Sequence, residues 1–193
     1  IEFHQQSLEI KREIGDRHGE AQSLNNLGNV YRSLGQYQQA IKFQQQSLAI
    51  AWEIGDRQGE ARSLGNLGIA YKSLGQYQQA IEFQQQSLGI KREIGDRQGE
   101  AQSLNDLGNA YDSLGQYQQA VEFHQQSLDI EREIGDRRGE ANSYFNQGLS
   151  FIKLEQMDEA SESFKAAREI YESLGLSTDV EDCDEELQNL SSA

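Results

Sequence analysis

Three histidines and one cysteine are the side chains of this sequence best suited to catalysis or to binding a metal. His4, His18, His124 and Cys183 lie far apart, and no cluster of Cys, Asp or Glu has the spacing of a metal site. No Gly-rich loop precedes a Lys followed by Ser or Thr, as phosphate binding would require. We therefore predict no catalytic residue, no metal and no cofactor, and we expect a protein that is not an enzyme.

Side-chain amides offer a different chemistry, because an amide both donates and accepts hydrogen bonds. A row of amides can pair with the backbone of an extended peptide whatever the peptide's side chains are. Asparagines recur at spacings of 40 or 80 residues in three series: Asn25 and Asn105; Asn26, Asn66 and Asn146; Asn29 and Asn109. The candidate chemistry is therefore recognition by hydrogen bonding.

The elements that must position these amides repeat along the chain. The segment Ile14-Gly15-Asp16-Arg17 returns three times, each time 40 residues later, at 54–57, 94–97 and 134–137. Such self-similarity is typical of one repeat array rather than of separate globular domains.

Each repeat has the pattern of two helices joined by a tight turn. Leu24, Leu27 and Tyr31 recur at spacings of three and four, which is the apolar stripe of an amphipathic helix. Asp16 is placed to cap that helix, and Gly35 is placed to end it in a left-handed conformation, so we expect a helix from about 17 to 34. A second helix is expected from 37 to just before 55. The absence of Pro and the abundance of Gln, Glu, Ala and Leu agree with an all-α fold.

The repeated signature resembles that of the tetratricopeptide repeat (TPR) family. In the first full repeat its residues are Leu24, Leu27, Gly28, Tyr31, Ala40 and Ser47. The long period is most similar to the branch of kinesin light chains, of the spindle-orientation adaptor that binds Inscuteable, and of bacterial multidomain proteins. The resemblance implies a right-handed superhelical solenoid of antiparallel helix pairs.

The pattern predicts the following division of the chain. Residues 1–14 correspond to the second helix of a truncated preceding repeat, and four repeats follow at 16–55, 56–95, 96–135 and 136–175, the last of them degenerate. Residues 176–193 are expected to form an acidic capping helix and tail.

A glycine stands in the middle of the first helix of every repeat, at Gly28, Gly68, Gly108 and Gly148. Because glycine costs about 1 kcal/mol relative to alanine inside a helix, its recurrence predicts close helix packing. We expect the facing small residues to be Ala40, Ala80, Ala120 and Ala160.

The resemblance also implies a binding site, because the first helix of each TPR lines a concave groove. The groove residues expected on this basis are Gln22, Asn25, Asn26, Asn29, Arg32, Arg62, Asn66, Lys72, Asn105 and Asn109. The first two repeats carry basic groove residues, whereas Asp106 and Asp112 make the third acidic. The alternative is that these side chains only solvate a concave surface or bond neighbouring helices.

Charge narrows the choice of partner. The net charge of −15 lies entirely in residues 99–193, whereas residues 1–98 are balanced. An acidic surface repels phosphate backbones and anionic lipids, so we expect a protein or peptide ligand, no nucleic acid and no membrane. We predict a cytoplasmic interaction scaffold. The alternative is an architectural or regulatory module that forms homo-oligomers through its exposed N-terminal half repeat.

Overall fold

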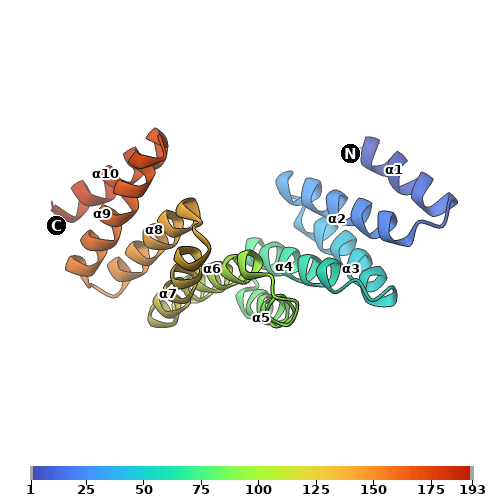
Figure 1. Ribbon diagram of the computed structural model, residues 1–193, viewed down its shortest axis with the longest axis horizontal. Helices are drawn as coiled ribbons and strands as arrows, with labels where there is room; N and C mark the ends of the chain where they lie inside the picture. Colours follow the sequence, from blue (N-terminus) through green and yellow to red (C-terminus); the bar gives the residue numbers. More distant parts are fainter. Residues whose placement is uncertain (1, 192–193) are drawn as a thin grey trace. The chain divides into compact units, whose positions relative to one another are not determined.

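The computed structural model describes residues 2–191, and these form ten α-helices without a strand. The all-α prediction is therefore confirmed. The helices are α1 (Glu2–Glu13), α2 (Arg17–Ser33), α3 (Tyr37–Glu53), α4 (Arg57–Ser73), α5 (Tyr77–Glu93), α6 (Arg97–Ser113), α7 (Tyr117–Ile134), α8 (Arg137–Lys153), α9 (Met157–Ser173) and α10 (Ser177–Ser191) (Figure 1).

The same residues begin and end the helices in successive repeats. Asp16 precedes α2, and its Oδ1 accepts a hydrogen bond of 2.8 Å from the backbone N–H of Gly19. Asp56 and Asp136 cap α4 and α8 in the same way. Gly35 then follows α2 with a φ of 71°, a left-handed conformation that favours glycine.

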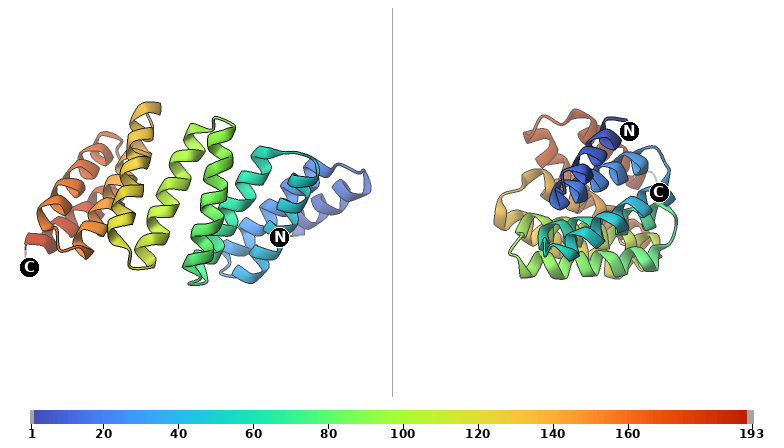
Figure 2. Two further views of the ribbon diagram at one scale, coloured as in Figure 1. Left: turned by 90° about the horizontal axis from the view of Figure 1, so that it is seen from below. Right: turned by 90° about the vertical axis from the view of Figure 1, so that its right-hand side faces the viewer.

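The helices fall into two compact units, Ile1–Asp96 and Arg97–Ala193. Within each unit, consecutive helices run side by side in opposite directions (Figure 2). Even-numbered helices are the first of each pair and are called A helices below. Odd-numbered helices from α3 onward are the B helices.

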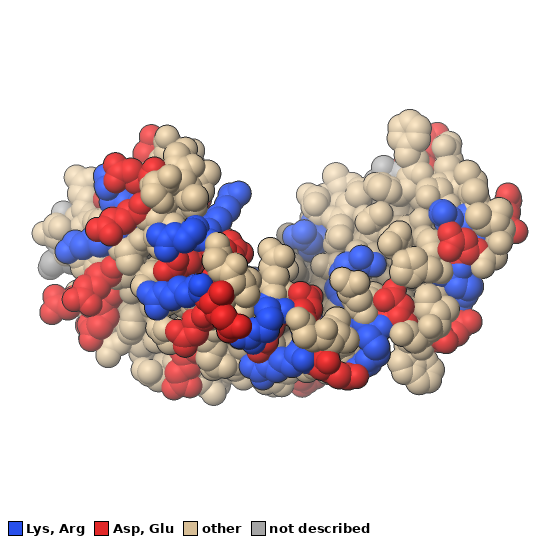
Figure 3. Space-filling view, in the orientation of Figure 1, with Lys and Arg blue, Asp and Glu red and all other residues tan. Residues whose placement is uncertain are grey.

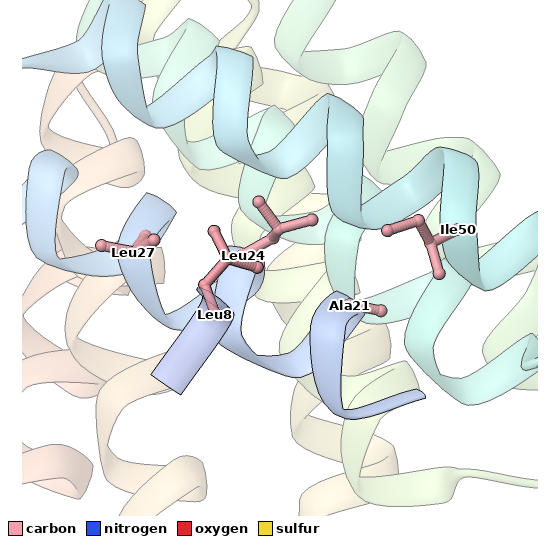
Figure 4. Packing of buried hydrophobic residues seen from close by; sticks show 5 residues of the cluster. All are labelled: Leu8, Ala21, Leu24, Leu27 and Ile50. Atoms are coloured by element: carbon pink, nitrogen blue, oxygen red, sulfur yellow. The ribbon is translucent and has the colours of Figure 1, made fainter. Parts of the chain in front are cut away.

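The core of the first unit lies between helices of successive pairs. Leu8 of α1 packs with Ala21, Leu24 and Leu27 of α2 and with Ile50 of α3 (Figure 4). Leu24 and Leu27 are fully buried, in agreement with the apolar stripe read from the sequence. Neighbouring helices thus bury their apolar stripes against one another, as in other repeat arrays.

The mid-helix glycines have a different partner from the one expected. A Cβ at Gly28 would lie 2.5 Å from Nε2 of Gln44, and a Cβ at Gly68 would lie 2.7 Å from Cγ of Gln84. His124 and Phe164 occupy the same place against Gly108 and Gly148. The predicted close packing is present, but the middle residue of the B helix causes it rather than the alanine series that begins with Ala40.

Ion pairs join the start of one A helix to the end of the B helix that follows it. Arg17 pairs with Glu20 in its own helix and with Glu53 at the end of α3. Arg57 bonds Glu60 and Glu93 in the same way, and in the second unit Arg97 pairs with Glu133. The recurring Asp-Arg dipeptide therefore has a structural role: the Asp caps the helix and the Arg connects the pair.

Helix α10 covers the last helix pair. Cys183 is fully buried against Ala141 of α8 and against Ala167, Ile170 and Tyr171 of α9. Residues 192–193 of the predicted tail lie outside the described residues.

Candidate functional site

In the first unit, the predicted groove residues lie on the A helices α2 and α4. Gln22, Asn26 and Arg62 are exposed. Asn29, Arg32, Asn66 and Lys72 are partly buried. These side chains, with Asn25, make up what we call the first A-helix face.

Asn25 has a structural position within this face. It is only 3% exposed, and its Nδ2 donates to Oε1 of Gln44 at 2.8 Å. Gln44 in turn donates from Nε2 to the backbone carbonyl of Asn25 at 3.0 Å. Asn25 therefore connects α2 to α3. For this residue, the structure agrees with the alternative that such side chains bond neighbouring helices. The signal in the sequence is Gln44 itself, an amide where an apolar residue is usual.

A second amide bond links neighbouring A helices. Asn66 of α4 donates from Nδ2 to Oδ1 of Asn25 at 3.4 Å. In the second unit, Asn146 of α8 donates to Oδ1 of Asn105 of α6 at 3.0 Å. The bond uses an N–H of Asn66 and leaves its carbonyl oxygen as the group able to accept from a peptide N–H.

None of the predicted groove residues on α2 and α4 is acidic. Glu20 and Glu60, on the same two helices, are already paired with Arg17 and Arg57. The buried Nε of Arg32 makes no hydrogen bond among residues 2–191. The charge of this face is therefore positive, carried by Arg32, Arg62 and Lys72.

The second unit has a pocket of about 230 Å³ on its A-helix face. Its walls come from α6, from the start of α8 and from the end of α7. The lining residues are Gln98, Ala101, Gln102, Asn105, Glu131, Asp136, Arg138, Gly139 and Asn142. Asn105 was predicted as a groove residue. Gln102 occupies the same repeat position as the predicted groove residue Gln22.

Glu131 is one of the lining residues that were not predicted as part of the groove. Its side chain is buried at 4% exposure, and Oε1 accepts a hydrogen bond of 3.0 Å from Ser127. Burial raises the pKa of this carboxyl, and the charges of Asp136 and Glu140 add to the rise, while the hydroxyls of Ser143 and Ser127 offset part of it. In the sequence, Glu131 is one of many acidic residues, and nothing distinguishes it from the others. Its burial follows from the packing of α7 between α6 and α8.

Asp112, expected to make the third repeat acidic, is engaged within the fold. Ser150 donates to both of its carboxylate oxygens, at 2.9 and 2.8 Å, and Nε2 of His124 lies 3.4 Å from Oδ2. Its carboxylate thus ties α6 to α7 and α8. Asn109, predicted on the same face, is partly buried.

Surface charge differs between the units. Asp and Glu gather toward the carboxyl-terminal helices, whereas neutral side chains cover much of the surface over α1 and α2 (Figure 3).

On the B-helix side, Trp52 of α3 is 76% exposed. It borders a hollow of about 400 Å³ with Leu48, Ala49 and Leu64.

Comparison with known proteins identifies the repeat. A model of the tetratricopeptide repeat matches residues 1–53, 59–133 and 100–173. The chain belongs to the tetratricopeptide repeat family. No curated protein matches this TPR chain in sequence.

Solved structures share its fold. BtubC from P. vanneervenii superposes with a TM-score of 0.73 at 17% identity, over 98% of this TPR chain and 88% of BtubC. A kinesin light chain-like protein of Podospora anserina with nearly identical TPR-like repeats gives 0.66 at 21% identity, over 89% and 94%.

A signal transduction ATPase of Pyrococcus horikoshii with a TPR sensor gives 0.79 at 19% identity, over 86% of this chain but only 26% of the ATPase. Proteins of this family generally serve as non-enzymatic scaffolds that bind other proteins. Between residues 2 and 191, none of the helices combines the length and the apolar character needed to cross a membrane.

Proposed function

We propose that the first A-helix face binds an extended peptide segment of a partner protein, with acidic side chains on that segment. The single observation that carries the proposal is the row of amides and cations on α2 and α4, in which hydrogen bonds hold Asn25 and Asn66. The family membership supports the broader role of a protein-interaction scaffold.

Amides fixed by the fold provide the backbone recognition. The bonds among Asn25, Gln44 and Asn66 restrict these side chains before a ligand arrives. Because less conformational freedom is then lost on binding, such preorganised groups gain affinity. Asn26 is exposed one residue beyond Asn25 and supplies a second amide to the face.

Charge provides the selectivity for acidic segments. Arg32, Arg62 and Lys72 lie on the same face of two adjacent helices, and the acids of those helices are paired elsewhere. Complementary charge favours an acidic partner and speeds its association at low salt.

The test is a peptide-array screen with the wild-type chain, followed by affinity measurement on captured peptides. Asn26→Ala, Asn66→Ala and Arg62→Ala are each expected to weaken binding, Arg62→Ala by about tenfold, equivalent to roughly 1.4 kcal/mol. Lys42→Ala is the matched control, because Lys42 is an exposed cation on the B helix α3. Equal affinity of all four variants and the wild type would overturn the proposal.

Self-association is a second candidate, favoured by a specific observation on α1. Phe3 is 87% exposed and Ile10 is 56% exposed, whereas their repeat counterparts Phe43 and Ile50 are packed. We propose this apolar face of α1 as the contact in a homo-oligomer. A solution mass that stays at that of the monomer across a wide concentration range would exclude this role.

A further inference from the structure

The pocket of the second unit contains two carboxylates and one cationic side chain among its described lining residues. Glu131 comes from the end of α7 and Asp136 precedes α8. Arg138 lies on the wall and is exposed, and it forms no ion pair with either acid within the described chain. The two acids therefore share a pocket in which Arg138 is the one described cation, and it is paired with neither of them.

The Glu131 carboxylate is the clearest sign of a missing partner. Its Oε2 is buried and has no hydrogen bond among the described residues. The buried hydroxyl of Ser143 lies close enough to lower the pKa of this carboxyl, but it does not reach hydrogen-bond geometry with it. Even if that hydroxyl rotated toward Oε2, a serine supplies no positive charge, and an uncompensated buried charge is costly.

The repeat itself shows what stands at the equivalent place elsewhere. Position 131 corresponds to Lys11, three repeats earlier, and Asp136 corresponds to Asp16. Nζ of Lys11 lies 2.8 Å from Oδ2 of Asp16. That ammonium group lowers the pKa of the Asp16 carboxyl through its hydrogen bond.

Two neighbours of these positions are alike. Arg12 bonds Glu20 beside Lys11, and Arg132 bonds Glu140 beside Glu131. A glycine faces position 131, as it does position 11: a Cβ at Gly139 would lie 2.9 Å from Oε1 of Glu131. The exchange of lysine for glutamate thus removes an ammonium group and adds a second acid.

Two repeats lie between these positions: one has Lys91, like Lys11, and the other handles its capping acid in another way. Position 51 is Ala51, and Asp56 lies 3.2 Å from Nδ1 of His18. The residue in the place of His18 in the second unit is Gln98, which is neutral. Asp136 therefore has neither the lysine of one repeat nor the histidine of the other.

We infer that this pocket binds a primary alkylammonium group, with the carboxylates of Glu131 and Asp136 as its anionic partners. The bound nitrogen takes the place of the Lys11 ammonium, and amide oxygens of the lining Gln and Asn residues accept its remaining N–H groups. The group comes either from a lysine side chain of a protein partner or from a free polyamine. In the first case the inference rests on the proposed scaffold function.

The test uses butylammonium chloride as the probe, with sodium chloride at equal ionic strength as its reference. Amide chemical shifts of the full chain are followed by NMR. We expect saturable shifts confined to the end of α7 and the adjoining parts of α6 and α8. Shifts no larger than those with sodium, or spread over the acidic surface, would overturn the inference.

Variants distinguish binding in the pocket from nonspecific attraction to the acidic surface. Glu131→Gln preserves the shape of the side chain and is expected to weaken butylammonium binding at least fivefold. Glu131→Lys restores the lysine of position 11, and the internal ammonium should then abolish binding. Glu122→Gln removes an exposed acid from the same helix and should change nothing. Unchanged affinity in Glu131→Gln or Glu131→Lys would contradict the proposed site.

Two further probes identify the source of the group. Tighter binding of N-acetyl-lysine methylamide points to a partner's lysine, whereas tighter binding of spermidine points to a free polyamine. If neither binds above the sodium reference, the inference is wrong. Because butylammonium binding requires no peptide, its outcome is independent of peptide capture by the first A-helix face.

Discussion

Each B helix places one mid-helix side chain against a glycine of its A helix. The type of that side chain decides whether hydrogen bonds or apolar packing join the two helices. Gln44 exchanges two hydrogen bonds with Asn25, whereas Phe164 packs its ring edge-on against Phe145, with centroids 5.4 Å apart. Glycine is required in each case because the approach leaves no room for a Cβ.

Two helical glycines of the first unit give a matched prediction. Gly68→Ala should destabilise the chain by about 1–3 kcal/mol, because the new Cβ would lie 2.7 Å from Cγ of Gln84 and overpacking outweighs the gain in helix propensity. Gly89→Ala should stabilise it by about 0.5–1 kcal/mol, since nothing lies within 4 Å of that Cβ. Denaturant unfolding measures both, and equal effects would contradict the packing role of Gly68.

The raised pKa of Glu131 predicts a pH-dependent stability. Because the folded state binds the proton more tightly than the unfolded state, the wild type loses stability as pH rises from the ordinary value of 4.5 through the raised native pKa. The charges of Asp136 and Glu140 reinforce this loss, whereas the hydroxyls of Ser143 and Ser127 offset part of it.

Glu131→Gln removes this titration and should therefore be more stable than the wild type at neutral pH. The difference should disappear at a pH below the unfolded pKa, where both side chains are neutral. Unfolding free energies of the two proteins, measured across pH, provide the check. A constant difference would show that the carboxyl does not titrate abnormally.

At the scale of elements, the turns follow one rule with one exception. Gly35, Gly75 and Gly115 follow their A helices in the left-handed conformation, and Glu155 adopts it at the same place with a φ of 59°. A side chain there is strained, because its Cβ approaches the following carbonyl oxygen.

Replacing the exception should relieve the strain. Glu155→Gly is expected to raise the free energy of unfolding by about 1 kcal/mol. Gly35→Ala, the reverse exchange in the first repeat, should lower it by a similar amount. Thermal and denaturant unfolding decide the matter, and a destabilised Glu155→Gly would mean that the Glu155 side chain contributes contacts that outweigh the strain.

Docking of α10 protects Cys183. Its thiol is buried, and burial, together with the charges of Asp182 and Asp184, raises its pKa to about 11. We expect negligible labelling by a thiol reagent in the native protein at neutral pH and rapid labelling in Val180→Asp, which weakens the packing of α10. Rapid labelling of the wild type would show that α10 opens readily.

For the whole molecule, regular spacing made most of the fold predictable. Asp16, Gly35 and the Leu24–Leu27 stripe define helices at the positions observed, because caps and apolar periodicity act locally. The environment of Glu131 and the bonds of Asp112 were not predictable, because they depend on which side chains of three helices meet. The candidate groove residues could be placed on the A helices from the repeat, but the buried position of Asn25 required the structure.

The central claim is that the first A-helix face binds an extended peptide through its amides. The most direct measurement is NMR of the side-chain amide groups during titration with a captured peptide. We predict that the Nδ2 signals of Asn26 and Asn66 shift with the bound fraction, while the Nε2 signal of the exposed Gln78 on the B helix α5 stays unchanged. Shifts at Gln78 without shifts at Asn26 and Asn66 would contradict the claim.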